Sequence, residues 1–570
     1  MTFLHGPETP IVQTGSRPVR DTEVGIVGLV GSAPKWKVDP TKQSTNEAKL
    51  VLNRNQAAEL FGENEQGYTI PRALDAIFDQ VGPQGGVKVV VVNVFSDEDI
   101  ATTSVSDAEL TFTDDTIQLP YGVTNLVVGD DATPTTEYVL DTDYTFDVAT
   151  GIITRIDSGA ISAGQTVFVD YDYNSGGHYV AVDAASETFP SSGANTDVIQ
   201  LERGIRDVVV TGTGGSPTYT EDTDYTVDLV AGTIARLSGG SISEGDTVEI
   251  SYEYADPSLI QTSEIIGTTL QNGDRTGMEA WKDSFNLYGY FPKILIAPGY
   301  SPINAITSAL DVVANAIDSM VLVDAPLGTS YSDVISGRGP SGTINFNYSS
   351  SRIAGCYPHL KVFDSVLNAE TTEPFSQRLA GIWANKVVER GFWWSPSNSE
   401  IRGITGYNKT LEFIPGDASS EANTLNANGI ITYANYFGSG IRSWGNRSFA
   451  YPSSTALNNF VNVRFSQIVI NERIRLFAMQ FIDQPLTNAL IDAILESVNA
   501  YFRTLKRQNA IVNGTITYDP ADNPASELAT GQVKFRVDFV PPPPAERITF
   551  YSFLNLNLLD ELNVGREAVS

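Results

Sequence analysis

Residues able to bind a metal ion or to transfer protons are few in this chain of 570 residues. It contains three histidines, His5, His178 and His359, and a single cysteine, Cys356. Cys356 and His359 have the spacing of a metal-ligand pair, but a tetrahedral site needs a second pair that the sequence lacks. We therefore expect both residues to pack in a core, and we predict neither a metal nor a cofactor.

Two further patterns are similar to known binding motifs but do not match them. Asp141-Thr-Asp-Tyr144 suggests calcium, but position six of an EF-hand loop would be Phe146 instead of glycine. Asp side chains commonly fix turns by accepting hydrogen bonds from nearby N–H groups, and we favour that role over a weak surface metal site. Gly337-Arg-Gly-Pro-Ser-Gly342 lacks the lysine and the spacing of a phosphate-binding loop, so we expect an ordinary loop.

Catalytic motifs of metalloproteases and α/β-hydrolases (HExxH, GxSxG) are absent from the sequence, and so is a Walker A loop. The chain has 68 acidic residues, so close carboxylate pairs arise without any function. A glycan-cleaving enzyme would need one such pair in a cleft, and the sequence alone leaves that alternative open. Our prediction is a protein that is not an enzyme.

Charge and composition limit the partners and the compartment. The net charge is −32, which disfavours direct binding of nucleic acid, because phosphate contacts need clustered Lys and Arg. No apolar run of roughly 18 residues is present, so no membrane insertion is expected. The opening MTFLHGPETP lacks the basic and apolar regions of a secretory signal. A single cysteine allows no intrachain disulfide and fits folding in a reducing cytoplasm.

An internal repeat is the most informative feature of the sequence. Residues 141–173 return at 222–254, and 17 of these 33 positions are identical. Apolar and polar residues alternate in both copies, and glycines separate the short runs, as in strands joined by turns. The repeat predicts two tandem all-β domains, residues 99–182 and 183–257, each resembling a small sandwich.

The residues on either side of the repeat follow an α/β pattern. Continuous apolar runs such as Val24–Val30 and Val87–Val94 predict buried strands. A helix is expected from Pro71 onward. We therefore predict one discontinuous α/β domain, residues 21–98 plus 258–365, into which both β domains are inserted. A second domain is predicted over residues 366–540.

Two helices dominate the later part of that C-terminal domain. The run Asn471–Phe481 is one, and Asp483 is expected to cap the next, with Pro485 in its first turn. The predicted buried stripe of this second helix is Leu486, Leu490, Ile494, Val498, Tyr501 and Leu505. Three cations, Arg503, Lys506 and Arg507, come near its end, where they suit the helix dipole. They could instead contact a partner of opposite charge.

Strand-like segments set apart by proline lie near both ends of the chain. One consists of Ile11, Val12, Gln13 and Thr14, and the other, after the Pro541–Pro544 spacer, of Ile548, Thr549, Phe550, Tyr551, Ser552 and Phe553. An isolated strand satisfies its backbone groups by adding to the edge of another sheet. The two arms, residues 1–20 and 541–570, are thus either terminal strands of their own domain or strands donated to a neighbouring copy. Donation would give a head-to-tail contact that propagates.

Several motifs, in the same order, resemble those of tail sheath proteins of contractile phages and R-type pyocins. They are Val24-Gly-Ile-Val-Gly-Leu-Val-Gly-Ser-Ala-Pro34, Ile294–Gly299, Tyr357-Pro-His-Leu-Lys-Val362, Ala380-Gly-Ile-Trp-Ala384, Arg390-Gly-Phe-Trp393, Ser395-Pro-Ser-Asn398, Gly440-Ile-Arg-Ser-Trp-Gly-Asn-Arg-Ser448 and Phe460-Val-Asn-Val-Arg464. The resemblance covers residues 10–98 and about 258–555, and the β repeats fall outside it. The sequence departs from the family pattern at His359, where tryptophan is usual, and at Ser395 and Ser397, where alanine is usual.

The resemblance implies a multidomain α+β fold and a structural role without an active site. Sheath subunits of this family form six-membered rings stacked around a tail tube, and their terminal arms add strands to the C-terminal domains of neighbouring subunits. A baseplate signal starts contraction, which drives the tube through the host cell envelope. We therefore expect a virion protein, assembled in the bacterial cytoplasm. Its expected partners are copies of itself, the tail tube protein, the baseplate and the tail terminator.

The resemblance also assigns roles to the segments singled out above. The two strand-like arms become the candidates for strand exchange, and Arg503, Lys506 and Arg507 the candidates for facing the tube. The inserted β domains are expected to point outward as decoration. The main alternative is a protein that decorates the capsid or binds the host surface through its duplicated β domains. The missing secretory signal argues against a secreted adhesin.

Overall fold

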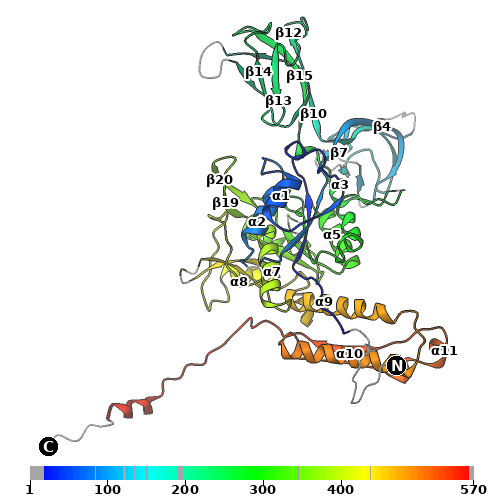
Figure 1. Ribbon diagram of the computed structural model, residues 1–570, viewed down its shortest axis with the longest axis vertical. Helices are drawn as coiled ribbons and strands as arrows, with labels where there is room; N and C mark the ends of the chain where they lie inside the picture. The colour runs from blue at the N-terminus through cyan, green and yellow to red at the C-terminus, as the bar shows by residue number, and fades with distance from the viewer. Residues whose placement is uncertain are drawn as a thin grey trace, which may run out of the picture.

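The structure, a computed structural model, describes residues 18–563 apart from positions 84, 114, 120–122, 132–136, 148–151, 191–196, 271, 341, 343, 345, 437 and 439. The predicted arm strand Ile11–Thr14 therefore lies outside the described residues. Two β units lie at one end of the molecule and a helix-covered sheet lies in the middle. A helical layer and the C-terminal tail lie at the other end (Figure 1). The protein is a mixed α/β protein built from several units.

The central sheet has eight strands in the order β2-β3-β1-β16-β17-β18-β22-β23. The six inner strands run parallel, and the edge strands β2 and β23 are antiparallel to their neighbours. The bounds are β1 (Ile26–Gly31), β2 (Ala48–Val51), β3 (Lys88–Asn93), β16 (Ile294–Ile296), β17 (Met320–Asp324), β18 (Ile353–Cys356), β22 (Ile430–Asn435) and β23 (Ile441–Trp444). Strands of a parallel sheet are buried on both faces, so they are apolar along their whole length. This is why the apolar runs of β1 and β3 could be recognised in the sequence.

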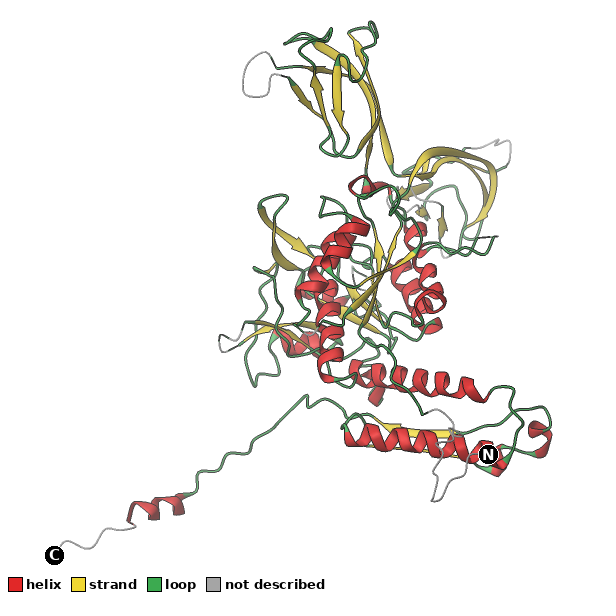
Figure 2. Cartoon of the chain, in the orientation of Figure 1, coloured by secondary structure: helices red, strands yellow, loops and turns green. Residues whose placement is uncertain are grey.

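Helices cover both faces of this sheet (Figure 2). On one face lie α1 (Arg54–Phe61), α2 (Ile70–Asp79) and α7 (Phe375–Arg390); on the other lie α3 (Thr262–Ile266) and α5 (Asn304–Ala316). The Asn53 side chain caps α1 by accepting a hydrogen bond from the Gln56 N–H, and Gly62 ends the helix at a φ of 74°. Pro71 lies in the first turn of α2, as predicted.

Shorter elements complete the middle of the molecule. They are α4 (Ser284–Tyr288), α6 (Tyr331–Ser336), α8 (Glu421–Ala427) and the small antiparallel sheet of β19 (Leu360–Asp364), β20 (Ala369–Glu373) and β21 (Gly406–Tyr407). The predicted boundary between residues 365 and 366 cuts through this region. β22 and β23 follow the boundary in sequence, yet β22 pairs directly with β18. One continuous apolar core includes residues on both sides of this boundary.

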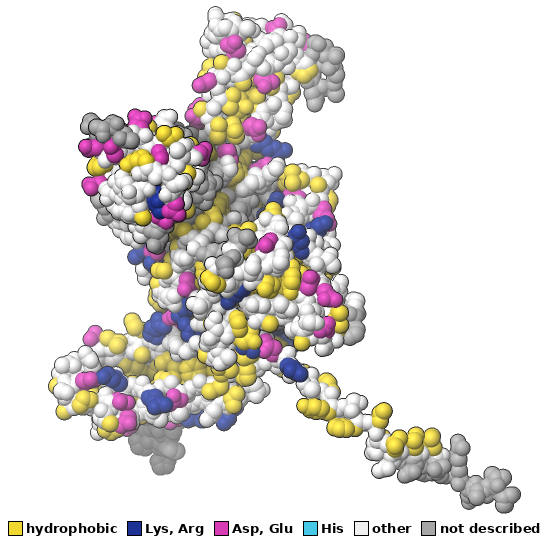
Figure 3. Space-filling model, turned by 180° about the vertical axis from the view of Figure 1, so that it is seen from behind, with side chains coloured by type: hydrophobic (Ala, Val, Ile, Leu, Met, Phe, Trp, Pro, Cys, Tyr) yellow, Lys and Arg dark blue, Asp and Glu magenta, His cyan; other side chains and the backbone are white. Residues whose placement is uncertain are grey.

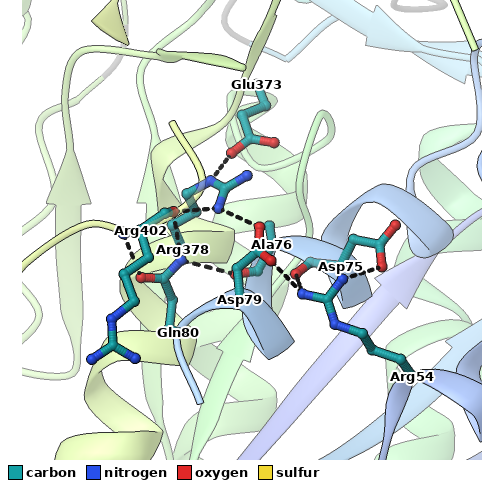
Figure 4. Close-up of polar contacts among 8 residues, drawn as sticks. All are labelled: Arg54, Asp75, Ala76, Asp79, Gln80, Glu373, Arg378 and Arg402. Atoms are coloured by element: carbon teal, nitrogen blue, oxygen red, sulfur yellow. Dashed lines mark hydrogen bonds and ion pairs between the residues drawn. The ribbon is translucent and has the colours of Figure 1, made fainter. Parts of the chain in front are cut away.

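A polar network joins α2 to α7 and β20 (Figure 4). The Arg378 guanidinium contacts Glu373 and lies 2.9 Å from the Asp79 carboxylate, and it also donates to the Arg402 carbonyl. Asp79 contacts Arg54 on α1 as well. Burial raises the pKa of Glu373, whereas Arg378 opposes that shift. The network ties α1, α2, α7 and β20 together.

The two β units repeat the same arrangement of strands. The first contains β4 (Asp97–Thr111), β5 (Thr116–Gln118), β6 (Val123–Gly129), β7 (Tyr144–Asp147), β8 (Ile152–Arg155) and β9 (Thr166–Gly177). The second contains β10 (Tyr179–Thr188), β11 (Val198–Gln200), β12 (Ile205–Gly212), β13 (Tyr225–Asp228), β14 (Thr233–Arg236) and β15 (Thr247–Ala255). Each unit has two three-stranded sheets, ordered β4-β9-β6 and β5-β8-β7 in the first and β10-β15-β12 and β11-β14-β13 in the second. Each encloses an apolar cluster of its own.

The repeated Asp-Thr-Asp-Tyr motif fixes a turn in both units. The Asp143 carboxylate accepts hydrogen bonds from the N–H groups of Val139 and Ala160, each at 2.8 Å. Asp224 does the same in the second unit, with Thr220 and Ser241 as donors. These bonds lower the pKa of both carboxyl groups. The predicted role in turn formation is confirmed.

The chain enters the first β unit after Ser96, passes to the second at His178 and returns to the body at Asp256, and His178 joins these three crossings. The Ser96 N–H, on the first crossing, donates to His178 Nδ1 at 2.8 Å. The Asp256 N–H, on the third, donates to the His178 carbonyl at 2.8 Å. His178 Nε2 lies 3.0 Å from the carboxylate of Glu264 on α3. The ring also packs 5.2 Å from that of Phe95, so polar and aromatic contacts together attach the β units.

The C-terminal layer consists of α9 (Val461–Ala478), α10 (Asn488–Arg507), α11 (Ala525–Leu528) and the hairpin of β24 (Asn513–Thr517) and β25 (Arg536–Val540). The predicted start of the second helix is wrong. Thr487 is its cap, accepting a hydrogen bond from the Leu490 N–H, whereas Asp483 has a φ of 63° and lies outside the helix. Pro485 also disfavours helical backbone at the residue before it. Of the predicted stripe, Val498, Tyr501 and Leu505 are buried, Leu490 and Ile494 are half-buried, and Leu486 is exposed.

Ion pairs tie α9 to the sheet above it. Lys293, just before β16, lies with its Nζ atom 2.6 Å from an oxygen of Glu472 on α9, and its side chain is fully buried. Arg473 pairs with Asp21 at 2.8 Å, and Arg475 pairs with Asp318 at 2.5 Å. These pairs fix the C-terminal layer against the body. Among the described helices, none is long and apolar enough to cross a lipid bilayer.

Candidate assembly interface

The C-terminal tail is the least covered apolar segment of the described chain. Beyond Pro541–Pro544 the tail leads away from the body (Figure 1). Residues 548–553 belong to no helix or strand of this subunit, and Phe550, Tyr551 and Phe553 are 88, 82 and 84% exposed. A short 3₁₀ helix, η7 (Leu556–Asn563), follows them. Contiguous apolar residues exposed to this degree mark a surface that a partner covers.

An ion pair fixes the point at which the tail leaves the body. Arg447 Nε lies 2.9 Å from an oxygen of Glu546, and a second nitrogen of the same guanidinium contacts the other oxygen. The guanidinium packs over the rings of Phe460, at 3.7 Å, and Tyr451, at 4.4 Å. The motif Gly440–Ser448 contains Arg447, but nothing in the sequence indicates its partner 99 residues later.

The β24–β25 hairpin has one edge covered and one edge open. Asn499 on α10 covers β24, because its amide accepts from the Ile516 N–H at 3.2 Å and donates to the Ile516 carbonyl at 3.4 Å. The ring of Phe502 stacks on that of Phe539 at 6.0 Å. Within the described residues β25 pairs only with β24, so its other edge is free to accept a strand.

Apolar side chains gather on the C-terminal layer, as the view from behind shows (Figure 3). The exposed ones there are Met479, Ile482, Leu486, Val512 and Val540. Together with the tail they place exposed apolar side chains at this end of the molecule. Such a surface is suited to contacts between subunits.

The three cations near the end of α10 are exposed and weakly held. Arg503 pairs with Glu496 on the same helix at 2.6 Å, Lys506 donates to Asn513 at 3.2 Å, and Arg507 donates to Thr504 at 3.4 Å. All three side chains are exposed. They lie at the end of the molecule opposite the β units (Figure 1). This position leaves the three cations accessible to a partner protein. It is equally consistent with a favourable interaction between the cations and the dipole of α10.

The predicted packing of Cys356 and His359 in the core is confirmed. Cys356 is 1% exposed and Asp324, on the neighbouring strand, is also 1% exposed. Burial raises the pKa of the Cys356 thiol, and Asp324 raises it further. Burial lowers the pKa of His359, which Asp324 opposes. In the described part of the chain, no group of three or more His, Cys, Asp or Glu side chains is placed to hold a metal ion.

Comparison with known proteins relates the whole chain to one family. The tail sheath protein of Burkholderia phage BcepMu is 36% identical over 99% of this chain and 99% of its own length. The chain belongs to the phage tail sheath family. Family models for the phage tail sheath central domain and the phage tail sheath C-terminal domain match residues 273–449 and 453–554. The border between the two matches lies between β23 and α9.

Other known proteins match over different lengths of the chain. A putative prophage major tail sheath protein of Pseudomonas aeruginosa is 34% identical over 53% of this chain and 75% of its own length. A crystal structure of a sheath tail protein from Listeria innocua aligns with 92% of this chain and 96% of its own, at 10% identity and a TM-score of 0.41. The β repeats match a model of unknown function twice, at residues 96–189 and 177–264.

Proposed function

We propose that the chain is the structural subunit of a contractile tail sheath, polymerising as stacked hexameric rings around the tail tube. Contraction of the sheath would drive the tube through the host cell envelope. The observation that carries this proposal is the tail, an apolar segment exposed in one subunit and offset by prolines from a body with an open sheet edge. Membership of the tail sheath family supports the same role. We infer no enzymatic activity and no cofactor.

In the proposed assembly, residues 548–553 of one subunit add to the open edge of β25 in another. Burying four large apolar side chains contributes about 6–12 kcal/mol. About five backbone hydrogen bonds add roughly 3–8 kcal/mol. Ordering six residues costs about 6–12 kcal/mol in backbone entropy. The gains and the cost are of similar size, so a single contact is marginal and many contacts together are needed to hold a lattice. Residues 11–14 are proposed to act in the same way.

The elongated shape supports an orientation within the sheath. We propose that α10 faces the tube through Arg503, Lys506 and Arg507, and that the β units at the opposite end point outward. The β units enter the chain between β3 and β16, so we treat residues 99–182 and 183–257 as inserted domains of an α/β sheath core. The expected further partners are the tube, baseplate and terminator proteins. Assembly would occur in the host cytoplasm.

The first experiment is to express the full chain and examine it by negative-stain electron microscopy. Hollow tubes with helical striations are expected. A chain without residues 541–570 should remain a folded monomer, and so should one without residues 1–20. As the matched control, a chain without residues 99–257 should still form tubes.

Globular particles from the full chain, even after co-expression with tube protein, would refute the proposal. The host-binding alternative would then lead. Loss of folding on deletion of residues 99–257 would place the β units in the core. That outcome has a physical basis, because Tyr179 and Ala255 pack in the same apolar core as Phe95.

A further inference from the structure

A group of cations without carboxylate partners surrounds one cleft on the body. Lys386, Arg390 and Arg402 line it, and among the described residues none of them forms an ion pair. Most other cations of this acidic chain are paired, as Lys293 and Arg378 are. Figure 4 shows the Arg402 guanidinium turned away from Asp79 and Glu373. Glu389 and Glu400 also line the cleft, but neither reaches a cation at ion-pair distance.

The cations lie close enough to repel one another. Burial, together with the charges of Arg390 and Arg442, lowers the pKa of Lys386 to about 8. Lys386 donates to the Ser397 carbonyl at 2.7 Å and to the Ser399 hydroxyl at 2.9 Å, both neutral acceptors. Arg442 donates to the Asn398 carbonyl at 3.2 Å. Arg390 and Arg402 are exposed, so their positive charges are accessible to an anionic partner.

Aromatic side chains continue this cleft into a larger one. The cleft with the cations has a volume of about 280 Å³. It shares Lys386, Trp394 and Asn398 with a neighbouring cleft of about 770 Å³, which Trp393 and Trp444 also line. The Trp394 side chain is 42% exposed, and the Arg390 guanidinium lies 5.5 Å from its ring. The joined groove therefore offers apolar rings next to cations, which suits a segment with apolar and acidic residues.

The end of the tail has this complementary character. In η7, Leu556, Leu558, Leu559 and Leu562 are all more than half exposed. The sequence places Asp560 and Glu561 among these leucines. Pro542–Glu546 of the same chain form a wall of the larger cleft, and from there the tail leads away from the body. A tail directed away from its own groove is placed to reach the groove of another subunit.

We infer that residues 554–563 of one subunit dock in the Lys386–Arg390–Arg402 groove of a second copy, with the leucines against the tryptophans and the acids against the cations. The inference rests on the proposed function, because it needs neighbouring copies in an assembly. It adds a second contact beyond the strand formed by residues 548–553. The part of this contact between acids and cations is ionic, so that part weakens as the salt concentration rises.

Charge reversal and its rescue test the inference in the full chain. The groove variant carries Arg390→Glu and Arg402→Glu, both at exposed positions. The tail variant carries Asp560→Lys and Glu561→Lys. Each should lower the fraction of protein that sediments as tubes about tenfold at low salt, because like charges at an interface repel. The chain with all four substitutions should recover to within about twofold of the original.

A matched control separates a specific contact from a general charge effect. Arg503→Glu with Lys506→Glu changes the net charge by the same amount on α10, and the tail variant should not rescue it. Groove and tail variants that assemble normally, or a combination no better than its parents, would overturn the inference while leaving the sheath assignment intact. Absence of tubes from the unsubstituted chain would instead count against the proposed function. Circular dichroism of each variant excludes misfolding.

Discussion

Removing one member of the buried pair Lys293–Glu472 should loosen the C-terminal layer from the body. The Lys293 side chain is fully buried and that of Glu472 is 10% exposed. The second oxygen of Glu472 is also buried, and no hydrogen bond of the described residues reaches it. Lys293→Met would therefore leave a buried carboxylate without any partner. Breaking a buried pair in this way costs about 3–5 kcal/mol in the free energy of unfolding.

The assay is urea unfolding of a chain lacking residues 541–570, so that assembly does not contribute. All six tryptophans lie outside the β units, so their fluorescence reports on the body. Lys293→Met with Glu472→Leu should recover most of the loss, since apolar replacement of both partners is often neutral or stabilising. Lys49→Met, which breaks an exposed pair with Glu47, should cost at most about 1 kcal/mol. A double variant no more stable than Lys293→Met would refute the reasoning.

Three further predictions concern single side chains. Arg338 donates hydrogen bonds to five backbone carbonyls. Arg338→Met should therefore lower the free energy of unfolding, measured in urea, by about 3–5 kcal/mol, and Arg338→Lys should restore little of this loss. An Arg338→Lys variant as stable as the original chain would contradict this prediction. Asp143→Ala and Asp224→Ala should each lower the stability of their own β unit by about 1–3 kcal/mol, as measured by amide hydrogen exchange. A single substitution that reduced the protection of both units equally would contradict this prediction. Lys386 has a folded pKa of about 8, below its unfolded value near 10.5, so the unfolded chain binds more protons between these pH values. The free energy of unfolding of the original chain, relative to that of Lys386→Met, should thus rise from pH 8 to pH 10. A difference that did not change with pH in urea unfolding would contradict this prediction.

The sequence alone is enough to locate elements that are recognised by their own residues or by their immediate neighbours in the chain. β1 and β3 are buried on both faces, so their apolar runs identify them without knowledge of their partners. The asparagine and glycine at the ends of α1 act within one turn of that helix. The predicted start of α10 is wrong because Asp483 and Thr487 are both residue types that cap helices well. Only the backbone direction after α9 decides between them.

Features that depend on distant residues could not be predicted in the same way. β22 joins the central sheet beside β18, although 73 residues separate the end of one from the start of the other. Arg447 acts through Glu546, and the groove forms where Lys386 and Arg402 meet in space. In each case the residue type is visible in the sequence, but its partner is set by tertiary packing. The arms remain predictions for the same reason, since their partners would lie in other subunits.

The distribution of contacts within the subunit bears on how a sheath could change length. α9 is held to the sheet by Lys293, Arg473 and Arg475, so the body and the C-terminal layer should move together. As far as the structure describes it, to residue 563, the tail has no comparable contacts beyond Glu546. If residues 548–553 are donated as proposed, a change in the spacing of neighbouring subunits would be absorbed between Glu546 and that strand. Because Arg447 fixes one end of that short connection, Glu546→Gln should lengthen the flexible segment and make tube diameters in electron micrographs less uniform. Tubes of unchanged uniformity would show that the donated strand, and not the Arg447 contact, sets the geometry.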